Sequence, residues 1–116
     1  MRILVTISPR LYRETLGLCI HGRRPDFDVL LAPPWPLDGR AERFRPHVLV
    51  QDTEEAGLPP ALAEGVLCRV RILLADRVVA KIELDGTASE VHDVCLEDLF
   101  EVLEGAEMLS HGDGGG

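Results

Sequence analysis

The sequence of 116 residues predicts a single α/β domain built on a three-layer open sheet. In the first half, three short aliphatic segments alternate with helical or proline-rich segments, which is typical of parallel strands joined by crossovers. In the second half, only Asp76 and Arg77 separate two strand-like segments, and this gap is too short for a crossover. The sequence therefore predicts a parallel first half, an antiparallel second half and a closing helix.

The first strand and helix are indicated by their periodicity. RILVTI (2–7) is a continuous aliphatic run, as expected for a strand buried on both faces. Ser8 is a favoured N-cap and Pro9 is tolerated at the first helical position, so a helix should begin there. Apolar residues then recur at helical spacing over 11–20, and the helix should end near Gly22.

Two further parallel strands should complete the first half. FDVLLA (27–32) follows the helix, and HVLVQD (47–52) begins directly after a proline. A strand–helix–strand unit of this length gives parallel strands with a right-handed crossover. We expect a short helix of about two turns within 37–45, and one helical turn over 61–64 in the connection that precedes the second half.

The second half should form a meander. CRVRILLA (68–75) alternates polar and apolar residues, which indicates a half-exposed strand, and VVAKIEL (78–84) should pair with it antiparallel. The hairpin dipeptide Asp85-Gly86 leads into a third member over 87–94.

The domain should span residues 1–109 and end with a closing helix. Apolar residues recur at helical spacing from Leu96 to Leu109, whereas the Gly-rich tail 110–116 should be disordered. The expected core consists of Ile3, Val5, Leu16, Cys19, Ile20, Val29, Leu31, Val48, Val50, Ile72, Leu74, Val79, Ile82, Leu84, Leu99, Phe100 and Leu103.

Composition excludes several classes of function. The net charge of −8 and the scattered arginines argue against nucleic-acid binding. No apolar run approaches the roughly 20 residues that cross a bilayer, and the N-terminus lacks a signal-peptide pattern, so we expect a cytoplasmic protein without membrane contact. The three cysteines (Cys19, Cys68 and Cys95) lack the short-spaced pairs of zinc sites. They are expected in the core, with no metal or cofactor bound.

The first half resembles a known family in three segments: RILVTISPRLYRETL (2–16), RPDFDVLLA (24–32) and RPHVLVQDTEEAGLP (45–59). Their order and spacing are similar to those of the receiver domain of bacterial response regulators. The resemblance implies a flavodoxin-like sheet and makes Asp52 the phosphoacceptor equivalent. It also places Ile7 and Ser8 at the positions where the family carries its acidic pair.

This departure from the family pattern bears on function. Receiver phosphorylation requires a divalent cation, and Asp52 alone cannot form a cage for one. The resemblance therefore implies a non-catalytic, stand-alone pseudo-receiver, acting as a regulatory or protein-interaction module in bacterial signalling. The alternatives are a phosphoacceptor receiver that uses Asp52, and a small flavodoxin-like ligand-binding protein. Without a cation site, the sequence favours a simpler interpretation of Asp52, as a strand-terminating residue that caps nearby backbone N–H groups.

We also expect a homodimer. A meander that ends an open sheet leaves an edge strand with unpaired backbone groups, here around residues 87–94. A twofold contact could use this edge, or the closing helix through Phe100 and Leu103.

Overall fold

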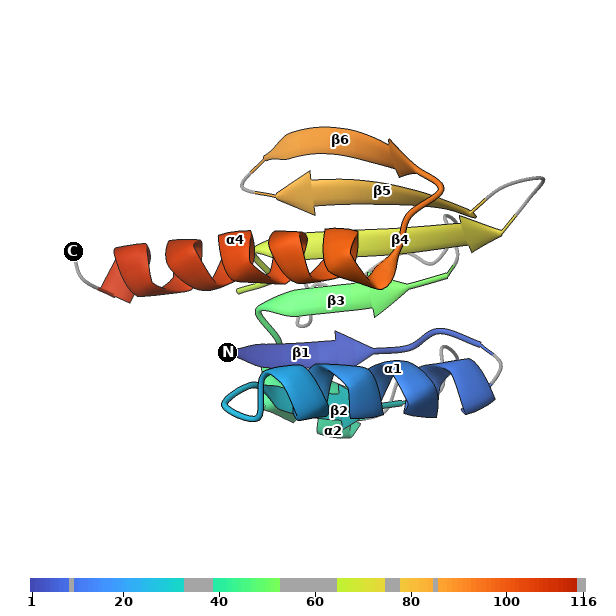
Figure 1. The fold of residues 1–116 in the computed structure, drawn as a ribbon. Coiled ribbons are helices and arrows are strands. Elements are labelled where there is room, and N and C mark those ends of the chain that lie inside the picture. Colours follow the sequence, from blue (N-terminus) through green and yellow to red (C-terminus); the bar gives the residue numbers. More distant parts are fainter. Residues whose placement is uncertain (9, 33–38, 53–64, 75–77, 85, 115–116) are drawn as a thin grey trace.

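The protein is described by a computed structural model that covers residues 1–8, 10–32, 39–52, 65–74, 78–84 and 86–114 (Figure 1). The expected helical turn over 61–64 lies outside these residues. Among the described residues, no helix has the length and apolar character needed to cross a membrane. The elements, in chain order, are β1 (Arg2–Val5), α1 (Arg10–Arg23), β2 (Asp28–Leu31), α2 (Gly39–Phe44), β3 (Val48–Gln51), β4 (Cys68–Leu74), β5 (Val78–Leu84), β6 (Thr87–His92) and α4 (Leu96–Gly114).

One six-stranded sheet organises the fold, with the strand order β2-β1-β3-β4-β5-β6. Parallel pairing joins β1 to β2, β1 to β3 and β3 to β4, whereas β5 pairs antiparallel with both β4 and β6. The predicted α/β class and the predicted antiparallel meander are confirmed. The finer prediction of a flavodoxin-like sheet is not matched, because β5 runs opposite to the other strands and β6 adds a sixth strand beyond it.

The main core lies on the face of the sheet that α1 and α4 cover together (Figure 1). Alternate strand residues point to this face, among them Ile3 and Val5 of β1. Ile20 of α1 packs on them, and α4 adds four buried residues at helical spacing: Leu99, Phe100, Leu103 and Ala106. Both long helices therefore occupy one layer.

A smaller apolar cluster covers the opposite face. Leu4 of β1 and Leu49 of β3 are fully buried there with Ala32, and Phe44 at the end of α2 packs against them. The predicted third layer therefore consists, among the described residues, of the six-residue α2. Leu4 and Leu49 were missed as core residues because the expected core followed only one face of each strand.

Most of the expected core is found inside. Nine of those residues are buried: Ile3, Val5, Ile20, Val48, Val50, Ile82, Leu99, Phe100 and Leu103. Five more are half-buried and pack against them: Leu16, Val29, Leu31, Ile72 and Leu84. Cys19 and Val79 are half-buried without joining this cluster. The side chain of Leu74 is outside the part of the chain that the structure describes. Phe100 and Leu103 are only 3% and 0% exposed, so both belong to the core of a single chain. The dimer contact through the closing helix stays a prediction.

The closing helix is longer than predicted. α4 continues to Gly114, whereas the sequence predicted a disordered tail from residue 110. Once a helix is nucleated, each further residue adds a backbone hydrogen bond, so the helix extends past its last apolar residue despite the glycine content. At its start, the backbone N–H of Cys95 donates to the Asp98 carboxylate at 2.9 Å, which is one half of a capping box.

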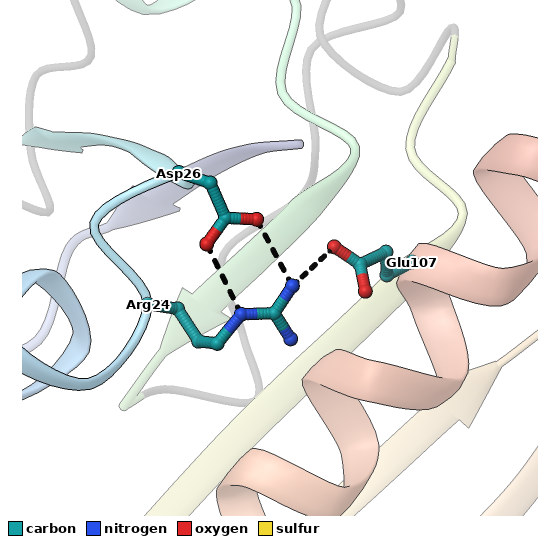
Figure 2. A network of polar contacts seen from close by, with 3 residues as sticks. All are labelled: Arg24, Asp26 and Glu107. Atoms are coloured by element: carbon teal, nitrogen blue, oxygen red, sulfur yellow. Dashed lines mark hydrogen bonds and ion pairs between the residues drawn. The ribbon is translucent and has the colours of Figure 1, made fainter.

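Arg24, in the turn between α1 and β2, joins that turn to α4 (Figure 2). Its guanidinium donates to both carboxylate oxygens of Asp26, at 3.1 and 2.9 Å, and to the Glu107 carboxylate at 2.6 Å. The hydrogen bond with Arg24 holds the pKa of Asp26 below its usual value. One residue earlier, Arg23 makes a bidentate ion pair with Glu97 of α4. These two arginines align α4 with the end of α1.

Candidate functional site

The carboxyl ends of β1 and β3 bring together two residues that the sequence singled out. The two strands are neighbours, so their ends lie side by side at one edge of the sheet. There the backbone N–H of Ser8 donates to a carboxylate oxygen of the half-buried Asp52 at 2.7 Å. The contact ties the segment after β1 to the end of β3 and occupies one Asp52 oxygen.

The positions that match the family's acidic pair do not surround Asp52 with charge. Ile7 is 9% exposed and belongs to the main core. Thr6, which precedes it, is buried and donates its hydroxyl to the carbonyl of Val50 at 3.1 Å. The described residues hold no group of three His, Cys, Asp or Glu side chains that could bind a metal ion. The phosphoacceptor role of Asp52 stays a prediction.

His47 is a structural residue at the start of β3. Its ring nitrogen Nδ1 accepts the backbone N–H of Arg2 at 3.1 Å, and its carbonyl accepts the N–H groups of Leu67 and Cys68. Burial, followed by the positive charge of Arg2, lowers the pKa of His47. The imidazole is thereby kept neutral, as an acceptor that links β1 to β3.

The three cysteines differ in environment. Cys68 is 1% exposed, as predicted, and burial raises the pKa of its thiol to about 12. Cys19 is half-buried. The prediction that Cys95 is a core residue is wrong: it is exposed, because it stands at the start of α4, where its thiol donates to Asp98 at 3.3 Å.

These environments predict an order of thiol modification. At pH 8 we expect a maleimide to modify Cys95 first and to leave Cys68 unmodified in the folded protein, because only thiolates react and the Cys68 thiolate is suppressed by burial. Peptide mapping by mass spectrometry measures the order, and Cys95→Ser should remove the fastest phase. Equal rates for Cys68 and Cys95 without denaturant would contradict the described burial.

An apolar groove lies on the helix-covered face, between α1 and the start of α4. It has a volume of about 180 Å³ and its floor is formed by β4 and β5. Leu16 lines it from α1, and Leu96 and Leu99 line it from α4. Its lining is otherwise apolar except for Cys95 and Asp98 at the beginning of α4.

Sequence reasoning did not find this groove. Its residues are spread from 16 to 102, and each one follows the periodicity of an ordinary core position. The periodicity of the strands did predict that residues such as Val70 and Ile82 share a face, but the space left between two helices depends on how far apart they pack.

The outer side of α1 is apolar as well. Leu11 and Leu18 are 67% and 73% exposed, and they lie two turns apart on the same side of the helix. Tyr12 is 53% exposed and lies one turn from Leu16, which lines the groove. Across the groove, Leu96 of α4 is 40% exposed. We call Leu11, Tyr12, Leu16, Leu18 and Leu96, together with the groove, the α1–α4 surface.

The fold and this surface define an α/β domain with several exposed apolar side chains on α1 and α4. No protein-family model matches the chain, and no curated protein resembles it in sequence. It is similar to a crystal structure of the protein Rv3404c from Mycobacterium tuberculosis, which is described as uncharacterised and a "likely sugar N-formyltransferase". The sequences are 18% identical, with a TM-score of 0.49; the match covers 97% of this chain and 66% of that one.

This finding overturns one prediction. The sequence led us to expect a protein that is not an enzyme, whereas the similar structure is described as that of an enzyme. We therefore withdraw the prediction of a non-catalytic protein. At a TM-score of 0.49 the similarity assigns no activity, substrate or site residue to this chain.

Proposed function

We propose that the chain is a protein-interaction module that binds its partner through the α1–α4 surface. Three large apolar side chains, each more than half exposed on one helix, carry this proposal: Leu11, Tyr12 and Leu18. Clusters of exposed apolar residues mark interaction sites in soluble proteins, and these three residues lie within two turns of one helix. The proposal includes a role in bacterial signalling, which the resemblance of the first half to receiver domains supports.

The energetics favour a bound state for these residues. Fully burying one leucine side chain contributes about 1.5–3 kcal/mol. Leu11 and Leu18 leave most of that contribution unused in the isolated chain, because they point away from the core. A partner that covers both leucines would gain this contribution at two points along one side of α1.

The shape of the surface indicates the form of the partner. A helix that presents apolar residues at i, i+3, i+4 and i+7 fits a groove flanked by an exposed apolar ridge. The chain carries a net charge of −8, so basic residues beside the apolar stripe would be favoured. The proposed partner is therefore a basic amphipathic helix.

A peptide selection tests this proposal. A library of displayed 18-residue peptides is selected on the full chain, and the enriched peptides are assayed against variants by fluorescence anisotropy. We expect amphipathic basic peptides whose affinity falls at least tenfold with Leu11→Lys/Leu18→Lys, because two lysines on the ridge would have to be desolvated on binding. Glu101→Lys, which also raises the net charge by two from an exposed position on α4, should leave affinity unchanged.

Two outcomes would contradict the proposal. The first is the enrichment of peptides that bind the double lysine variant as well as the natural chain. The second is the absence of any enriched sequence pattern. Both leucines are exposed, so the melting temperature of the double variant should remain close to that of the natural chain and show that the fold is retained.

A further inference from the structure

The strand β6 forms one end of the sheet (Figure 1). In the strand order it has β5 on one side and no described strand on the other. Five of its six residues are exposed, and Val91 alone is half-buried and packs against the core. The outer edge of β6 is therefore a candidate for pairing with another strand.

The backbone groups that face outward follow from one hydrogen bond. The N–H of Val94 donates to the carbonyl of Val78 at 3.4 Å, so Val78 directs its backbone groups toward β6. Along an antiparallel pair, residues whose backbone groups bond to the neighbouring strand alternate with residues whose backbone groups point away from it. With the observed register, the residues of β6 that bond to β5 are Thr87, Ser89 and Val91. The residues whose N–H and C=O point outward are Ala88, Glu90 and His92.

The first half of this edge carries none of the features that block strand pairing. Proteins protect edges with proline, lysine, bulges or inward-pointing charges. Thr87, Ala88 and Ser89 are uncharged, small and exposed. The strand is interrupted only after His92, where Asp93 has a φ of 53°. Five consecutive residues, 87–91, are thus free of blocking features except for the charge of Glu90.

We propose that β6 pairs antiparallel with β6 of a second copy of this chain, with Ser89 on the twofold axis. This pairing would extend the sheet to twelve strands, with β2 of each copy at its two ends. Because the same edge is used by both copies, the contact stops at a dimer. The proposal is independent of the α1–α4 surface, which lies on α1 and the start of α4.

Symmetry limits the register to a few choices. A twofold axis perpendicular to the sheet keeps every side chain on its own face of the sheet. Residues that lie directly opposite each other must point to the same face, and side chains alternate between the faces along a strand. The residue nearest the axis must therefore lie opposite its own copy. Glu90 on the axis would place two carboxylates opposite each other, which is destabilising. Val91 on the axis would extend the pairing past His92 into Asp93, where the strand has ended.

Ser89 on the axis avoids both problems. It places Thr87 opposite Val91 of the second copy, which pairs two β-branched residues on the helix-covered face. It places Glu90 opposite Ala88 of the second copy. Within each chain Glu90 already lies opposite Lys81 of β5. Across the new contact the two Glu90 side chains are diagonal neighbours, further apart than a directly opposite pair. In this register, the outward N–H and C=O groups of Ala88 form hydrogen bonds with those of Glu90 of the second copy. The same bonds form between Glu90 and Ala88 of the second copy.

Cysteine cross-linking tests the register. In a Cys19→Ser/Cys95→Ser background, which removes the two accessible thiols, Ser89→Cys, Glu90→Cys and Val91→Cys are oxidised with copper–phenanthroline. Residues directly opposite each other in a non-hydrogen-bonded pair are close enough for a disulfide. We expect a covalent dimer from Ser89→Cys in at least tenfold excess over the other two. A covalent dimer formed mainly by Glu90→Cys or Val91→Cys, or by none of the three, would overturn the proposed register.

Sedimentation equilibrium tests the dimer itself. Ala88→Pro removes an N–H that points outward and leaves the bonds between β5 and β6 intact, whereas Ala88→Gly keeps that N–H. We expect the natural chain and Ala88→Gly to dimerise at micromolar concentration and Ala88→Pro to dissociate at least tenfold more readily. A single 12.8 kDa species for the natural chain across this range, or equal dimerisation of Ala88→Pro, would overturn the proposal.

Discussion

Replacing Leu103 with alanine should lower the free energy of unfolding by about 2–5 kcal/mol, the range for truncating a buried leucine. Leu103 is 0% exposed and lies at the centre of the face through which α4 packs on the sheet. The loss combines the transfer free energy of the removed carbons with the cavity that remains, because the surrounding strands can relax only in part. Urea denaturation followed by circular dichroism measures the change.

Met108 provides a matched control on the same helix. It is 75% exposed, so Met108→Ala should change the free energy of unfolding by less than about 0.5 kcal/mol. Leu103→Met conserves the volume of the side chain and should lose less than about 1.5 kcal/mol. If Leu103→Ala weakened self-association and left unfolding unchanged, Leu103 would be a surface contact and the described packing of α4 would be incorrect.

Replacing Gly17 with valine should destabilise the fold by about 1–3 kcal/mol, as expected for overpacking a filled interface. A Cβ atom at Gly17 would lie 2.8 Å from Cδ2 and 3.3 Å from Cδ1 of Leu31, because α1 approaches β2 closely at this point. Leu31 is itself half-buried against the core, so its movement displaces other side chains.

Gly22→Val isolates this effect. Gly22 lies in the same helix, and a Cβ atom there would meet nothing within 4 Å. Both substitutions exchange glycine for valine in α1, so their intrinsic helix propensities change alike and only the contact with Leu31 differs. Thermal unfolding of the two variants measures the difference. Equal melting temperatures would show that α1 and β2 are further apart than described.

The local structure was determined largely by the sequence. The aliphatic run at 2–7 and the helical spacing from Leu11 to Ile20 predicted β1 and α1, because each repeat is set by neighbouring residues. The two-residue gap at Asp76 and Arg77 required antiparallel pairing, and β4 and β5 pair in that way. These features depend on backbone geometry within a few residues, so they could be predicted without knowledge of the rest of the chain.

The candidate sites were predicted in part. The resemblance to receiver domains placed Ser8 at an acidic-pair position and Asp52 at the phosphoacceptor position, and Ser8 does contact Asp52. The α1–α4 surface was not predicted, because helical periodicity gives the spacing of apolar residues and not the number that the sheet can cover. Leu11 was counted in an ordinary apolar pattern and Leu18 was not, yet both lie on the far side of α1 from the core.

Only the tertiary structure decided which surfaces are buried and which are open. It placed α1 and α4 on one face, buried Phe100 and Leu103 beneath α4, and left Cys95 exposed at the start of that helix. Each of these results depends on contacts between residues far apart in the chain, such as the ion pair of Arg23 with Glu97. A sequence pattern shows which side chains are apolar. Their burial requires a second element that packs against them. The crossover connections and the alignment of the helices determine where that element lies.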